Sequence, residues 1–64
     1  MMNTVESRCL DVNGAILTLG NEVVLGTNKD KINGVVIALY DRNVISLDTN
    51  SEILSLDARN VRLA

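Results

Sequence analysis

The chain of 64 residues contains no histidine, tryptophan, phenylalanine or proline, and it has a single cysteine, Cys9, and a single tyrosine, Tyr40. One cysteine excludes a disulfide within the chain. One cysteine without any histidine argues against a structural zinc site, which takes four such ligands. The serines have no histidine to activate them as nucleophiles. We therefore expect a non-enzymatic protein without a metal or another cofactor.

An excess of positive charge and long apolar runs are also missing. Six basic and eight acidic residues give a net charge of −2, which disfavours nucleic acid as a partner because phosphate backbones attract an excess of Lys and Arg. No run reaches the length of a membrane span, and no basic segment followed by an apolar stretch marks a secretory signal. We expect no membrane partner and a cytoplasmic location, where a lone thiol stays reduced.

The chain does contain a series of short apolar runs that are separated by Asn, Asp, Gly, Ser and Thr. The runs are Val23–Leu25, Val35–Tyr40, Val44–Leu47, Ile53–Leu56 and Val61–Leu63. Runs of this length with turn residues between them are typical of a small all-β barrel or sandwich. The length allows one domain, whose small core favours self-association as an added source of stability.

The N-terminal third predicts a β-hairpin. Asn13-Gly14 separates two weakly alternating segments, Ser7–Val12 and Ala15–Leu19. This dipeptide favours a two-residue type I′ turn with positive φ at both positions. The alternative is a tight bend without strand pairing.

Two later polar segments predict turns, and two carboxylates belong with them. Asp41–Asn43 predicts a tight turn, and Asp57–Asn60 a single helical turn. Asp48 and Asp57 each follow a Ser-Leu step, and paired carboxylates can perform acid–base chemistry or hold a cation. Their positions favour turn caps instead, with Asp57 as the N-cap of the helical turn.

The order of elements from Gly20 onward resembles the Src-homology-3-like small barrels, including their KOW-type modules. Gly20–Val24 (GNEVV) is similar to the Gly-Asp-x-Val opening of these barrels, Gly34–Ile37 (GVVI) to the start of their second strand, and Asp57–Val61 (DARNV) to their helical turn and last strand. The resemblance implies a five- to seven-stranded barrel core over residues 20–64, preceded by an N-terminal strand or hairpin over residues 1–19.

One string within this resemblance misleads. Ala38–Asp41 spells ALYD, which occurs in signalling Src-homology-3 domains that bind proline-rich peptides. Docking of polyproline needs a groove lined with aromatic side chains. Tyr40 is the only aromatic residue here, so we interpret the string as a coincidence.

The second face of the central strands is the first candidate site. Because side chains alternate along a strand, Val36, Tyr40 and Val44 are expected to share one face and to point outward. An exposed apolar face of this kind marks an interface, either with a second copy or with a protein partner. The alternative is that the segment Cys9–Leu19 folds over this face and buries it.

Three basic residues in loops form the second candidate site. Lys29 and Lys31 lie in the longest polar loop, and Arg42 lies in the turn that follows Tyr40. Such loops contact RNA or partner proteins in KOW-type modules, but ordinary solvated charge is the simpler interpretation. Cys9 follows Arg8, and since strand neighbours point to opposite faces, we interpret Cys9 as a buried hydrophobe rather than a reactive thiol.

These observations favour a small interaction module that self-associates and binds a protein partner, of the kind found among small accessory proteins of bacteria and phages. One alternative is a KOW-like module associated with nucleic acid. A second is an oligomer that holds a small ligand at its subunit interfaces.

Overall fold

A computed structural model of the chain describes residues 8–27 and 29–64, and its fold is all-β. The elements are β1 (Cys9–Leu10), β2 (Ile16–Leu17), β3 (Glu22–Leu25), β4 (Ile32–Tyr40), the 3-10 turn η1 (Asp41–Asn43), β5 (Val44–Asp48), β6 (Ile53–Asp57), the 3-10 turn η2 (Ala58–Asn60) and β7 (Val61–Leu63). Each of the five predicted apolar runs is part of a strand. Ser7 of the predicted first segment and Asn28 of the longest loop lie outside the described residues.

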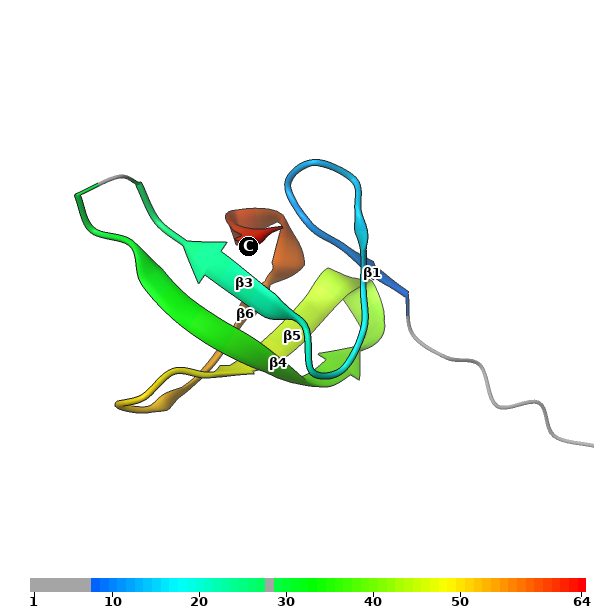
Figure 1. The fold of residues 1–64 in the computed structure, drawn as a ribbon. Coiled ribbons are helices and arrows are strands. Elements are labelled where there is room, and N and C mark those ends of the chain that lie inside the picture. Colours follow the sequence, from blue (N-terminus) through cyan, green and yellow to red (C-terminus); the bar gives the residue numbers. More distant parts are fainter. Residues whose placement is uncertain (1–7, 28) are drawn as a thin grey trace, which may run out of the picture.

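The strands form a two-stranded sheet, β1-β2, and a five-stranded antiparallel sheet with the order β6-β5-β4-β3-β7. Strand β4 is the centre of the larger sheet. Its first half pairs with β3 and its second half with β5. Figure 1 shows β4 continuing beyond the start of β3 toward the N-terminal hairpin. Within the described residues, no helix has the length and hydropathy of a membrane span.

A β-bulge in β4 decides which way the central side chains face. The register with β5 runs from Val36 opposite Leu47 directly to Ala38 opposite Ser46, so Ile37 is the extra residue. Since successive strand residues alternate between faces, one inserted residue reverses the facing of every residue that follows. Val36 therefore points into the core with Leu47, whereas Ala38 and Ser46 lie on the opposite face of the sheet.

The bulge corrects one sequence prediction. Val36 was expected to share an outward face with Tyr40 and Val44, but Val36 is only 1% exposed. Tyr40 and Val44 lie opposite each other beyond the bulge, and Tyr40 is 49% exposed. The sequence pattern was interpreted with an unbroken period of two, and this period does not hold across Ile37.

The N-terminal hairpin supplies part of the core, but it does not bury the face of Tyr40 as the alternative predicted, because Tyr40 stays 49% exposed. The buried cluster combines Cys9 and Leu17 from the hairpin with residues of the large sheet and of η2, namely Val23, Val36, Ile45, Leu47, Ala58 and Val61. The Cys9 Sγ lies 3.4 Å from the Tyr40 carbonyl oxygen and 3.6 Å from that of Val44. Cys9 is a buried side chain, which confirms the prediction made for it.

The hairpin itself is confirmed, but its turn is not type I′. Cys9 pairs with Leu17 and Leu10 with Ile16, which leaves a loop longer than two residues between the strands. Asp11 organises this loop, because its Oδ1 accepts the backbone N–H groups of Asn13 and Ala15, both at 2.8 Å. Backbone bonds close the same loop, because the Gly14 N–H donates to the Asp11 carbonyl at 3.0 Å and the Asp11 N–H donates to the Ala15 carbonyl at 2.9 Å.

The predicted turns are present, and one of the two predicted caps is correct. Asp57 caps η2 by accepting the Arg59 N–H at 2.9 Å. Asp48 does not cap the following turn. The Thr49 hydroxyl does so instead, because it accepts the N–H groups of Ser51 and Glu52.

Candidate binding groove

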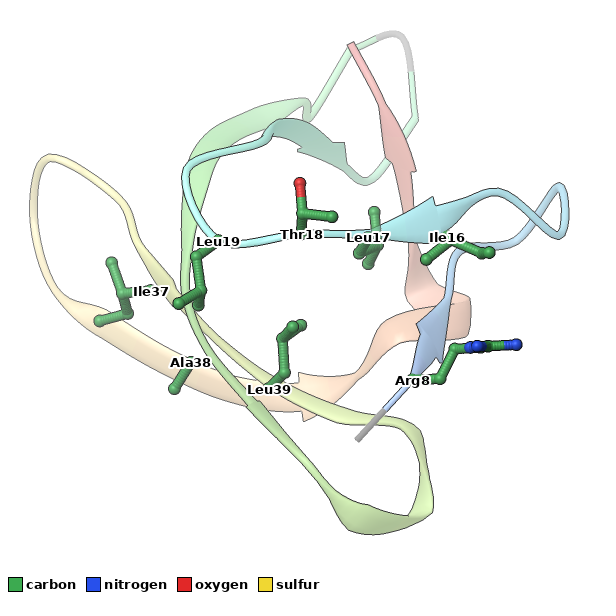
Figure 2. Close-up of a pocket in the computed structure, with 8 residues that line it drawn as sticks. All are labelled: Arg8, Ile16, Leu17, Thr18, Leu19, Ile37, Ala38 and Leu39. Carbon is green, nitrogen blue, oxygen red and sulfur yellow. The ribbon is translucent and has the colours of Figure 1, made fainter. Parts of the chain in front are cut away.

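An open groove of about 810 Å³ runs between β2 with the residues that follow it and the second half of β4. Figure 2 shows its lining, which consists of Arg8, Ile16, Leu17, Thr18, Leu19, Ile37, Ala38 and Leu39. Leu17 belongs to the buried core, and Leu39 packs against it. Ile16, Leu19 and Ile37 are 55%, 64% and 42% exposed. Three large apolar side chains that border one groove are more than the scattered single exposures usual on a protein surface.

The groove arises because β4 extends beyond the residues that pair with β3. The last bonds across this side of β4 join Val36 to the chain before β3, where the Gly20 N–H donates to the Val36 carbonyl and the Val36 N–H donates to the Asn21 carbonyl. Beyond Val36 the strand order places no further strand on this side of β4. The bulge at Ile37 then turns an apolar side chain toward the opening.

The wall opposite β4 is held by a local turn. The Thr18 N–H donates to the Asn21 Oδ1 at 2.7 Å, and the Asn21 N–H donates to the Thr18 carbonyl at 3.1 Å. Gly20 has a φ of +89°, which a glycine adopts without strain. These bonds fix Leu19 beside the groove, so this wall is already formed before a ligand binds.

Positive charge marks one end of the groove. Arg8 lies at the end away from Ile37 (Figure 2). The Arg8 side chain is exposed. A guanidinium in such a position can form paired, charge-assisted hydrogen bonds with a carboxylate of a ligand.

The structure separates the predicted basic residues instead of bringing them together. Lys29 and Lys31 precede β4, and Arg42 follows it. A strand as long as β4, with nine residues, spans about 30 Å. All three side chains are exposed, so they occupy opposite ends of the sheet. These three residues therefore form no shared basic patch, and the nucleic-acid alternative stays a prediction.

Sequence reasoning missed most of this groove. The sequence pattern predicts Ile16 and Leu19 as strand residues of the hairpin, and it places Ile37 on the face opposite to the one predicted to point outward. Their exposure depends on where β3 stops pairing with β4 and on the bulge at Ile37. Neither feature can be predicted from the residue types in these strands.

Metal and buried polar chemistry are not favoured elsewhere in the described parts of the chain. Residues 8–27 and 29–64 contain no group of three His, Cys, Asp or Glu residues placed to hold a metal ion. Every buried side-chain nitrogen or oxygen in these ranges has a hydrogen-bond partner.

No protein-family model matches the chain, and neither a curated protein nor a solved structure matches it. The proposed function therefore rests on the groove itself.

Proposed function

We propose that this protein is an interaction module that holds an extended apolar segment of a partner protein in the groove between Ile16–Leu19 and Ile37–Leu39. The observation that carries the proposal is the exposure of Ile16, Leu19 and Ile37 around a single opening. Burying one leucine-sized side chain contributes about 1.5–3 kcal/mol. Two or three such contacts on a wall that is already formed support binding without other chemistry.

A protein segment suits the groove better than a small polar ligand does. Sites for small molecules combine apolar walls with a few buried polar groups that orient the ligand. In the described residues, the buried polar side chains are Asp11, Ser46 and Thr49, and all of them are used within the fold. The groove offers apolar side chains and a peripheral cation, Arg8, which favours an apolar segment carrying an acidic residue at one end.

A comparison of matched variants tests this proposal. Peptides are selected from a phage-displayed random library against the protein, and their Kd values are measured by fluorescence anisotropy. We expect Leu19→Ser to raise the Kd about tenfold or more, because it removes an apolar contact from the wall. Ile53→Ser is the control, since Ile53 is equally exposed, at 65%, but lies on β6 outside the groove.

Two further measurements refine the test. Amide shifts in a titration should move at Ile16 and Ile37, and Arg8→Glu should remove the preference for an acidic residue in the selected peptides. Peptides that bind Leu19→Ser as well as they bind the unmodified protein would contradict the proposal. So would a selection in which no peptide binds.

The Src-homology-3-like barrel remains the proposed architecture around this groove. The strand order β6-β5-β4-β3-β7 and the 3-10 turn before β7 support it. In this proposal the N-terminal hairpin over residues 8–19 is an extension that covers one end of the barrel and forms one wall of the groove.

A further inference from the structure

Strand β6 ends the five-stranded sheet, and no other described strand pairs with its outer edge. The turn before β6 sets the direction of its backbone groups, because the Thr49 N–H donates to the Glu52 carbonyl at 2.9 Å. Antiparallel residue pairs alternate between bonded and non-bonded positions. With Thr49 and Glu52 bonded, the N–H and C=O groups of Ile53, Ser55 and Asp57 point away from β5, toward the free edge.

The opposite edge of the same sheet, on β7, is already occupied by the chain's own N-terminal segment. The Val12 N–H donates to the Val61 carbonyl at 2.9 Å. The Leu63 N–H donates to the Asp11 Oδ2 at 3.0 Å. The outward Val61 carbonyl and Leu63 N–H of β7 thus have partners, whereas the outward backbone groups of β6 have none among the described residues.

Strand β6 also lacks three of the features that often block strand addition. Such edges carry a proline, a lysine or a bulge. The segment Ile53–Asp57 has neither proline nor lysine, and its register with β5 is unbroken. Leu54 and Leu56, which face the core, remain only half-buried at this edge.

We propose that a second copy of this chain covers this edge, by antiparallel pairing of β6 with β6 about a two-fold axis at Ser55. This register uses the outward groups of Ile53, Ser55 and Asp57 in both copies. It places Leu54 opposite Leu56 of the partner subunit and Ile53 opposite Asp57 of the partner subunit. Apolar side chains meet on the core face, and no like charges stand opposite each other.

The occupied β7 edge decides the kind of assembly. A ring or fibre needs two different edges that join head to tail, whereas a two-fold contact joins the same surface on both copies. Because Asp11 and Val12 occupy β7, β6 is left to pair with itself. The result is a closed dimer with one continuous sheet, separate from the groove at Leu19.

The test measures association by light scattering and native mass spectrometry over a range of concentrations. Ser55→Lys places two ammonium groups opposite each other at the axis, and we expect it to raise the dimer Kd about tenfold or more. Ser55→Pro removes an outward N–H without removing a ladder bond to β5, so it should also give a monomer. Asn33→Lys adds the same charge on β4, an interior strand, and should leave the dimer intact.

Amide hydrogen exchange gives a readout that does not depend on any substitution. We expect the amides of Ile53 and Ser55 to exchange quickly in dilute protein and slowly at concentrations that favour the dimer. The amides of Leu54 and Leu56, which bond to β5, should be protected at both concentrations.

Three results would overturn this dimer. They are a strict monomer at millimolar concentration, an oligomer larger than a dimer, and a dimer that survives Ser55→Lys but dissociates with Tyr40→Asp on the outward face. Leu19→Ser should leave the dimer intact, so a failure of the groove and a failure of the dimer are seen separately.

Discussion

At the scale of single residues, Asp11 shows how a buried carboxylate is kept charged without a cation. Burial by itself raises the pKa of Asp11, but the backbone N–H groups of Ala15, Leu63 and Asn13 outweigh burial and hold the pKa below its ordinary value of 3.8. The side chain is 3% exposed and joins the loop of the N-terminal hairpin to β7. Its charge therefore stabilises two distant parts of the chain.

The lowered pKa of Asp11 predicts a loss of stability in acid. The folded protein binds the Asp11 proton more weakly than the unfolded chain does, so its stabilising effect is complete above pH 3.8 and is lost as the pH falls through the folded pKa. Asp11→Asn should cost about 1–3 kcal/mol at pH 7. Urea denaturation from pH 7 to pH 2.5 should show a smaller acid-dependent loss for Asp11→Asn than for the unmodified protein. Equal acid dependence in both proteins would contradict this role.

At the scale of elements, Asn43 joins the turn between β4 and β5 to the N-terminal hairpin. Its Oδ1 accepts the Leu10 N–H at 2.7 Å, and its Nδ2 donates to the Leu10 carbonyl at 3.0 Å and to the Asp57 Oδ1 at 3.1 Å. Its backbone has a φ of 62°, a conformation that asparagine tolerates better than most residues do. One side chain thus links η1 to β1 by bonding both the N–H and the carbonyl of Leu10, as a neighbouring strand would.

Two substitutions at Asn43 separate its hydrogen bonds from its backbone conformation. Asn43→Gly removes the bonds and keeps the positive φ free of strain, so it should cost about 1–3 kcal/mol of unfolding free energy. Asn43→Ala should cost about 1–2 kcal/mol more, because alanine disfavours positive φ. Thermal unfolding measures both, at about 4–8 °C per kcal/mol for a chain of this size. An alanine variant as stable as the glycine variant would contradict the contribution of the backbone.

The elements also show what a sequence can predict and where it stops. Apolar runs between polar turns locate β3 to β7. Each run is long enough to form one strand, and the residues of each polar segment favour a turn that ends it. The bulge at Ile37 adds one residue without changing the composition, so Val36 and Tyr40 face opposite sides although an unbroken period of two predicted one shared face. The turn at Asn13-Gly14 was predicted from its two residues alone, yet Asp11, outside that pair, closes the loop through its backbone and its carboxylate.

At the scale of the whole molecule, the groove depends on the N-terminal hairpin being part of the core. Ile16 and Leu19 form the groove wall only because Leu17, between them, is buried in the same cluster as Val23 and Ile45. A wall anchored in this way moves with the sheet rather than independently of it. Neither the anchoring nor the free edge of β6 could be predicted from the sequence, because both depend on contacts between segments far apart in the chain.

Substitution of Leu17 tests whether the hairpin and the sheet fold as one unit. Leu17→Ala should cost about 2–5 kcal/mol, since it leaves a cavity in the core, and a chain this short has only about 3–10 kcal/mol in total. The matched control is Leu19→Ala, two residues further on, which removes the same atoms from an exposed position and should cost less than about 1 kcal/mol. Urea denaturation measures both, and peptide binding should be lost together with folding in Leu17→Ala. If both substitutions cost the same, the hairpin would be a separate flap, and the wall of the groove would have to form when the partner binds.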